Sequence, residues 1–107
     1  MKLGAFEELV LLVVGSLDDE AYGVAIKETL HKKMGKSPSI GALHSALYRL
    51  ESKGYVISKE GGATTERGGR RKKFYRITAY GIQTLEEVNH IRHTLARQVP
   101  GLRLGLK

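Results

Sequence analysis

The feature that constrains this sequence most is a change of hydrophobic period near residue 55. Before that point, apolar residues recur every three or four positions, which is the period of an amphipathic helix. After it, residues 55–59 and 74–78 form short runs rich in aromatic and β-branched residues, which are typical of strands. A helical period returns from residue 79. We therefore expect three helices, then a β-hairpin, then one more helix.

Residues 4–17 and 21–34 are the first two expected helices. In the first, apolar side chains occupy nearly every side, so we expect burial on more than one face. Its valines leave a strand open as an alternative. The second helix follows the acidic run at residues 18–20, whose charges suit a helix N-terminus, and it ends before a turn at residues 35–38.

A third helix is expected from about Ile40 to Lys53, with Ser37 or Ser39 as its N-cap. One side of this helix carries an apolar stripe that we expect to face the core: Ile40, Leu43, Leu47 and Leu50. The opposite side is small, polar or aromatic: Gly41, His44, Ser45, Tyr48 and Ser52, with Arg49 alongside. A helix held by one stripe leaves its other stripe free to contact a ligand.

The basic residues are concentrated in the middle of the chain. The whole sequence of 107 residues has a formal charge of +7. Residues 1–30 hold two basic and six acidic side chains (−4), residues 31–76 twelve and three (+9), and residues 77–107 four and two (+2). An anionic polymer is the natural partner of the central block, and a merely solvated basic face is the alternative.

The two strand-like runs enclose a glycine-bounded segment at residues 61–69, which the basic residues Arg70, Arg71, Lys72 and Lys73 follow. We expect a long hairpin with a flexible basic arm, whose successive side chains point to opposite faces. Three helices and a basic hairpin are the plan of a winged helix-turn-helix, an α+β fold that is mostly α. Such a fold places its third helix in the DNA major groove and its hairpin along the backbone toward a minor groove.

Four strings, in order and with matching spacing, resemble the PadR family of bacterial transcriptional regulators. They are EELVLL at residues 7–12, AYGVAI at 21–26, GALHSALYRLE at 41–51 and ERGGRRKKFYRIT at 66–78. The resemblance, which extends from about Glu7 to Leu95, implies a winged-helix homodimer that mostly represses genes, often under the control of a small molecule or a stress signal. It also implies that the C-terminal helix builds the dimer, here as in the family's compact branch with a single helix. His44 stands where many members carry a tyrosine in the recognition helix.

DNA contacts are expected from the corner before the second helix, from the third helix and from the hairpin arm. The candidate residues are Tyr22, Ser39, Ala42, His44, Ser45, Tyr48, Arg49, Arg70, Arg71, Lys72 and Lys73. The resemblance places Tyr22 near the DNA backbone, and a half-buried tyrosine at the corner is the alternative. Ser39 can act as a cap and still contact a phosphate. Arg49 contacts DNA or, alternatively, pairs with Glu51 or with a neighbouring helix.

The last helix is expected from about Ala79 to Gln98, with Thr78 as its cap. Its apolar stripe has no obvious partner within the chain, so we predict an obligate homodimer that reads a palindromic operator. The expected interface is Phe6, Leu9, Val13, Ile82, Leu85, Val88, Ile91, Leu95 and Val99. Residues 1–78 then form the DNA-binding domain, 79–99 the dimerisation helix of the same unit, and 100–107 a flexible tail.

Composition and motifs argue against other classes of protein. The chain has no cysteine, which excludes disulfides, thiolate zinc sites and a cysteine nucleophile. Its longest apolar run, residues 9–14, is far shorter than the roughly 20 residues that cross a bilayer, so we expect no membrane partner and a cytoplasmic location.

Catalytic and metal-binding motifs are also weak. Glu86, His90 and His93 have helical spacing that suits a metal site, but a solvated polar face is the preferred interpretation, so no metal and no cofactor is predicted. No phosphate-binding loop or hydrolase triad motif is recognisable. The sequence therefore predicts a sequence-specific DNA-binding regulator and no enzyme. The alternative is an architectural module that binds DNA without reading sequence, or a protein-interaction module.

Overall fold

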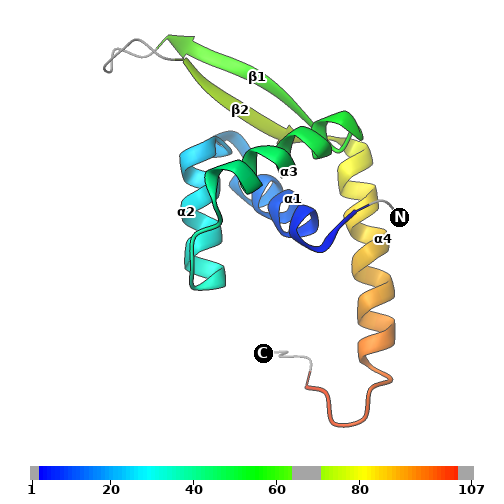
Figure 1. The fold of residues 1–107 in the computed structure, drawn as a ribbon. Coiled ribbons are helices and arrows are strands. Elements are labelled where there is room, and N and C mark those ends of the chain that lie inside the picture. Colours follow the sequence, from blue (N-terminus) through cyan, green and yellow to red (C-terminus); the bar gives the residue numbers. More distant parts are fainter. Residues whose placement is uncertain (1–2, 64–70, 104–107) are drawn as a thin grey trace.

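The computed structural model describes residues 3–63 and 71–103 of the chain (Figure 1). Its elements are α1 (Ala5–Leu17), a 3₁₀ turn η1 (Asp18–Glu20), α2 (Gly23–Met34), α3 (Ile40–Ser52), β1 (Val56–Ala63), β2 (Arg71–Ile77) and α4 (Ala79–Ala96). Their order is the predicted one, and the mostly helical α+β fold class is confirmed.

The boundaries around α2 and the hairpin differ from the prediction. The helix α2 begins at Gly23, because the two residues before it pair with the hairpin. Tyr22 is extended and forms a β-bridge with Phe74, and the amide of Tyr75 donates to the carbonyl of Ala21 at 2.8 Å. The strands β1 and β2 are antiparallel and longer than predicted. Their ladder continues past Glu60 with an irregularity in its register, so pairing extends into the glycine-bounded segment.

The core lies between α1, α2 and α3. Val10, Leu11 and Val14 of α1 are almost fully buried, as is the stripe of α3 formed by Leu43, Ala46, Leu47 and Leu50. The prediction that Ile40 belongs to this stripe is wrong, since its side chain is 60% exposed. It lines an open hollow between α2 and α3 instead of entering the core.

The first turn of α4 is fixed to the base of the hairpin. The hydroxyl of Thr78 donates to the carbonyls of Gly54 and Tyr55 at 2.8 and 3.1 Å, and it accepts from the amide of Gly81 at 2.9 Å. A Cβ at Gly81 would lie 2.4 Å from the carbonyl oxygen of Tyr55, so this close approach requires glycine. Tyr80 stacks on Tyr55 with ring centroids 5.1 Å apart.

The second half of α4 extends away from the rest of the molecule (Figure 1). The whole molecule, with this projection, measures 55 × 28 × 25 Å. Every residue from 89 to 95 is exposed. The first half is different: Val88 is buried within the chain, and Leu85 packs partly against the core. The expectation that the whole apolar stripe lacks an intrachain partner is therefore wrong for these two residues, because α1 and the hairpin base already cover the start of the helix.

The helix α4 ends at Ala96, two residues earlier than predicted, so Val99 lies in the turn that follows it. Of the tail predicted at residues 100–107, the last four residues lie outside the described part of the chain. Among the described helices, none is both long enough and apolar enough to cross a membrane.

Candidate nucleic-acid interface

The helix α3 has one face in the core and one face open. Its N-cap is Ser39, whose hydroxyl oxygen accepts from the amide of Ala42 at 3.0 Å, as predicted for a capping serine. On the open face, Ala42, His44, Ser45 and Tyr48 are all exposed, and Tyr48 is 72% exposed. His44, Ser45 and Tyr48 therefore lie together on the accessible side of the helix, and Ala42 is exposed at another edge of it.

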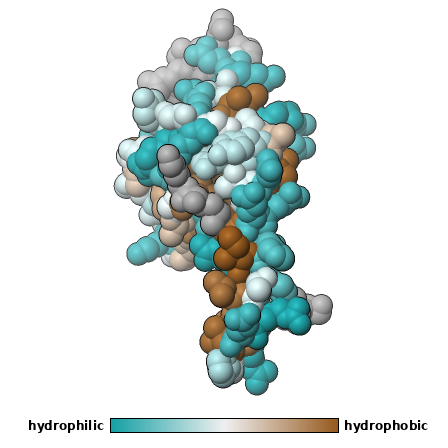
Figure 2. All heavy atoms as spheres, turned by 90° about the vertical axis from the view of Figure 1, so that its right-hand side faces the viewer, coloured by the Kyte–Doolittle hydropathy of each residue, from teal (hydrophilic) through white to brown (hydrophobic). Residues whose placement is uncertain are grey.

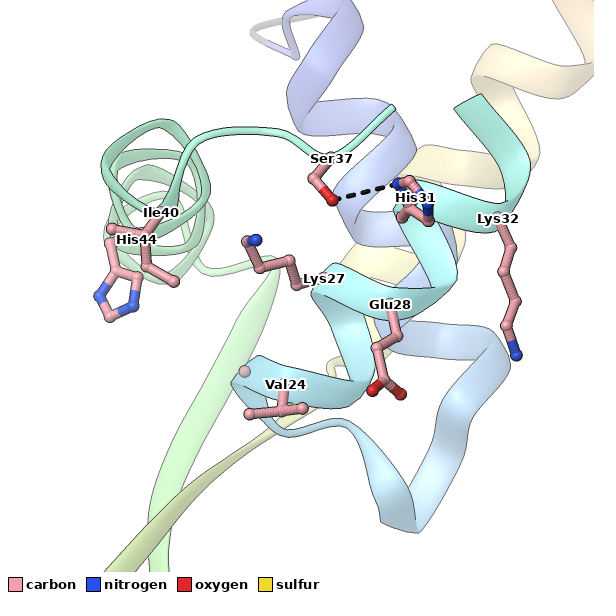
Figure 3. Close-up of a pocket in the computed structure, with 9 residues that line it drawn as sticks. Val24, Lys27, Glu28, His31, Lys32, Ser37, Ile40 and His44 are labelled. Carbon is pink, nitrogen blue, oxygen red and sulfur yellow. Dashed lines mark hydrogen bonds between the residues drawn. The ribbon is translucent and has the colours of Figure 1, made fainter. Parts of the chain in front are cut away.

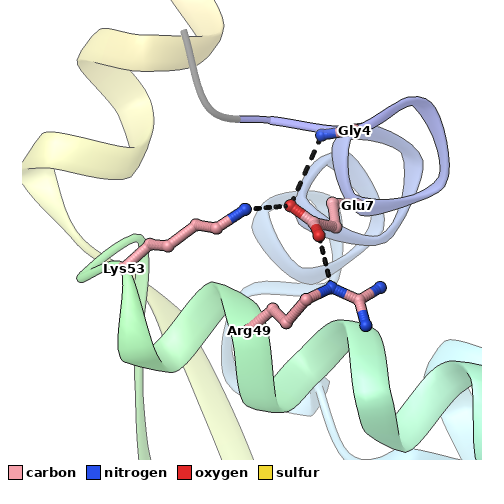
Figure 4. A network of polar contacts seen from close by, with 4 residues as sticks. All are labelled: Gly4, Glu7, Arg49 and Lys53. Atoms are coloured by element: carbon pink, nitrogen blue, oxygen red, sulfur yellow. Dashed lines mark hydrogen bonds and ion pairs between the residues drawn. The ribbon is translucent and has the colours of Figure 1, made fainter.

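A buried carboxylate ties α3 to α1 (Figure 4). Glu7, buried on α1, accepts hydrogen bonds from Nε of Arg49 and, at 2.8 Å, from Nζ of Lys53. Burial alone would raise the pKa of Glu7, but the hydrogen bonds from Lys53 and Arg49 outweigh it and hold this pKa below its usual value. The carboxylate therefore stays ionised at neutral pH and holds two cations of the third helix.

This network confirms the alternative in which Arg49 pairs with a neighbouring helix. Glu51, the other candidate partner, instead accepts from the hydroxyl of Ser58 at 2.7 Å. The side chain of Arg49 is still 47% exposed, and Figure 4 shows its terminal guanidinium nitrogens pointing away from Glu7. Pairing through Nε thus orients the guanidinium and leaves its outer edge accessible to an anion.

Sequence reasoning missed Glu7 as a member of this site. The signal was present, because an acidic side chain in the first turn of an otherwise apolar helix requires a partner when it is buried. Its partners lie 42 and 46 residues further along the chain, so no local pattern identifies them.

Tyr22 and the hairpin lysines form a second cluster. The ring of Tyr22 is half-buried, meets Phe74 edge-on at 5.5 Å between centroids, and carries Nζ of Lys72 at 4.3 Å above its face. Lys73 lies over Tyr75 instead, at 5.8 Å from the ring centroid, so the two lysines occupy opposite faces of β2, as alternation predicts. Arg70 and the side chain of Arg71 lie outside the described part of the structure.

A hollow of about 630 Å³ separates α2 from the N-terminal half of α3. Figure 3 shows Val24, Lys27, Ile40 and His44 bordering the same open space. Of these, the sequence identified only His44 as a functional residue. The helical period identifies an apolar stripe but not which of its turns a neighbour covers, and for this reason the prediction that Ile40 faces the core is wrong.

The residues predicted for a dimer interface divide into two groups. Leu9, Ile82, Ile91, Leu95 and Val99 are exposed, and Figure 2 shows apolar side chains along the projecting part of the molecule. Val13 and Val88 are buried within the chain, and Phe6 and Leu85 are partly buried against the core.

A groove of about 540 Å³ runs between α1 and α4 and is lined by Leu12, Ile82 and Leu85, among others. At its edge, Arg92 of α4 donates to Glu8 of α1 at 2.7 Å. Within the described residues, no group of three or more His, Asp or Glu side chains is arranged to hold a metal ion.

The chain is similar to proteins of known sequence and structure. The model of a family described as "Transcriptional regulator PadR-like family" matches residues 10–87. The transcriptional regulator Rv3488 of Mycobacterium tuberculosis is 32% identical over 84 residues, which cover 78% of this chain and 74% of that protein. The crystal structure of a PadR family transcriptional regulator from Eggerthella lenta has a TM-score of 0.67 and 32% identity, over 92% of this chain and 83% of that one. A PadR-like regulator from Bacillus cereus has a TM-score of 0.73 at 22% identity, over 96% and 95% of the two chains, and supports the fold alone.

Proposed function

The chain belongs to the PadR-like family of transcriptional regulators, and on that premise we propose that it is a homodimeric repressor that reads a specific palindromic operator. Membership of this family makes it a DNA-binding regulator of transcription and not an enzyme. In the proposed mechanism, the two copies of α3 occupy successive major grooves and exclude RNA polymerase from the promoter. The regulator acts where the DNA of a bacterial cell lies, in the cytoplasm.

The observation that carries this proposal is the open face of α3. A helix whose apolar stripe is buried by its own chain presents His44, Ser45 and Tyr48 outward, and a major groove about 12 Å wide admits such a helix. Arg49, oriented by Glu7, lies beside this face and suits a phosphate. We assign base reading to the open face, and backbone contacts to Tyr22, Arg49 and the basic arm.

The exposed half of α4 supports the homodimer. Ile91 and Leu95, in the second half of α4, present aliphatic side chains to water. Covering them with the same stripe of a second copy removes apolar surface from water at about 25 cal/mol per Å² and generates a two-fold axis. A two-fold protein matches a palindromic operator. We also propose that a small apolar molecule controls DNA binding, because the groove between α1 and α4 adjoins this interface.

Competition binding tests specificity. The full chain is titrated with the duplex upstream of its own gene in the presence of excess bulk DNA. We expect a preference of at least about 10³ for the specific duplex. Replacing His44 and Tyr48 with alanine is expected to reduce this preference, whereas replacing Arg70 and Arg71 weakens binding to all DNA about equally. Identical behaviour of the two double variants would contradict this division of roles.

The charge of +9 on residues 31–76 favours a second candidate, a module that binds DNA without reading its sequence. Salt dependence does not separate the two, because both neutralise phosphates: with six to ten phosphate contacts, affinity falls about 10³- to 10⁵-fold between 50 and 200 mM salt. A flat salt dependence rejects both candidates, and a strong dependence without sequence preference selects the second.

A further inference from the structure

The hollow between α2 and α3 is bordered by two aliphatic side chains that the fold leaves uncovered. Val24 is 63% exposed in the first turn of α2, and Ile40 is 60% exposed at the first position of α3. Single exposed aliphatic residues are common on protein surfaces. These two, however, converge on one space with His44, which belongs to the open face of the recognition helix (Figure 3).

The surroundings of this hollow indicate which partner it meets. Lys27 and Lys32 line it together with one carboxylate, Glu28, so its charged side chains are mainly cationic, which suits an anionic backbone. The first turn of a recognition helix is the end that enters the major groove. A partner that brings phosphates to the lysines and base edges to Ile40 is therefore double-stranded DNA.

An aliphatic side chain has no hydrogen-bonding group, so it can distinguish one base from another only by contact with an apolar group on the base edge. In the major groove this apolar group is the C5-methyl group of thymine, which adenine, guanine and cytosine lack. We propose that Val24 and Ile40 are specificity residues that contact thymine methyl groups in each operator half-site, with His44 contacting the adjacent base edge. This inference rests on the proposed function and deepens it, because it states which base the hollow selects.

The size of the expected effect follows from the burial of one methyl group. Removing a buried methyl-sized group from the contact lowers affinity about fourfold, the equivalent of about 0.8 kcal/mol. The preferred duplex is first selected from a random library with the full chain. Deoxyuridine, which lacks only the methyl group, then replaces thymine one position at a time. We expect one or two positions per half-site at which deoxyuridine weakens binding about fourfold.

Alanine variants of Ile40 and Val24 test whether these two side chains contact the thymine positions found in this way. Ile40→Ala and Val24→Ala are expected to bind the thymine and deoxyuridine duplexes equally well at the position each residue contacts, so that the fourfold ratio falls to about one. Both side chains are exposed, so thermal melting is expected to stay within a few degrees of wild type. Ile57→Ala is the matched control, because Ile57 is 57% exposed on β1 and does not line this hollow. It is expected to keep the fourfold ratio.

Two outcomes overturn the inference alone: a selected duplex in which no deoxyuridine substitution weakens binding more than twofold, or variants that retain the full ratio. In the second case the hollow has another occupant, such as a small effector molecule. Failure of the proposed function is a different result, since then the library yields no preferred duplex and both proposals fall.

Discussion

The helices α3 and α4 are both amphipathic, but they bury their apolar stripes in different ways. The stripe of α3 is buried over Leu43, Leu47 and Leu50, chiefly against α1. The stripe of α4 is covered only up to Val88, and Ile91 and Leu95 remain open to water. What each helix leaves exposed is therefore different in character. Apart from Ile40 at its first position, α3 exposes a polar and aromatic face, whereas the second half of α4 exposes aliphatic side chains.

This difference indicates which partner each helix meets. A polar face with cations at its side suits the base edges and phosphates of DNA. An aliphatic face suits another apolar protein surface. The helix α1 lies between the two, since Glu7 pairs with α3 and Glu8 pairs with α4. Four tests by substitution, described from the largest expected effect to the smallest, examine this division.

The largest effect is expected for Leu95→Glu on the open half of α4. In a two-fold dimer each substitution is present twice, so the loss is about 3–6 kcal/mol per dimer from two aliphatic side chains. The dimer dissociation constant then rises about 10²- to 10⁴-fold, which sedimentation equilibrium measures. His93→Glu adds the same charge on the opposite side of α4 and is expected to leave the dimer intact. A dimer unaffected by Leu95→Glu would show that this face meets something other than a second copy.

The next effect is expected for Glu7→Gln, which removes the buried charge that holds Arg49 and Lys53. Both cations are partly exposed, so the free energy of unfolding falls by about 1–3 kcal/mol, less than for a fully buried ion pair. The pKa of Glu7 is lowered in the folded state, so its stabilising contribution is fully present above the unfolded-state pKa of about 4.3 and is lost as the pH falls through the folded-state value.

Urea denaturation at several pH values checks this. The difference in the free energy of unfolding between wild type and Glu7→Gln is expected to be constant near neutral pH and to become smaller in acid. Glu87→Gln, which removes an exposed carboxylate of α4, serves as the control and should alter stability by less than about 0.5 kcal/mol. A difference between Glu7→Gln and wild type that grows on acidification would contradict the sign of the pKa shift.

A smaller effect on the free energy of unfolding distinguishes the N-cap of α3, Ser39, from the N-cap of α4, Thr78. Both caps are side-chain hydroxyls, but Ser39 is exposed and makes one bond, whereas Thr78 also donates to the carbonyls of Gly54 and Tyr55 at the hairpin base. Thr78→Ala is therefore expected to cost about 1–2 kcal/mol and Ser39→Ala about 0.5–1 kcal/mol. Thermal and urea unfolding compare the two variants directly. Equal losses would mean that the additional bonds of Thr78 add nothing to stability.

The order of elements and most of the α3 stripe are predictable from sequence, because they depend on local periodicity. The ion network of Glu7 is not, since its partners are more than 40 residues away in sequence. The predictions for Ile40 and Val88 differ from the structure in opposite directions for one reason. The period of a helix shows which side is apolar, but only the packed neighbours decide which turns are covered. The exposure of His44, Ser45 and Tyr48 agrees with the expected open face, and their contact with DNA stays a prediction.

The smallest effect on stability is expected for the double variant His44→Ala, Tyr48→Ala. Both side chains are exposed on α3, so truncating them changes the free energy of unfolding by less than about 0.5 kcal/mol. On the buried side of the same helix, Leu47→Ala is expected to cost about 2–5 kcal/mol, which makes it the internal reference in urea denaturation. A loss above about 1 kcal/mol for the double variant would show that Tyr48 supports the fold. A face of α3 that contributes nothing to stability is free to vary with the operator sequence. If the double variant keeps its stability but loses its operator preference, that loss measures DNA recognition alone.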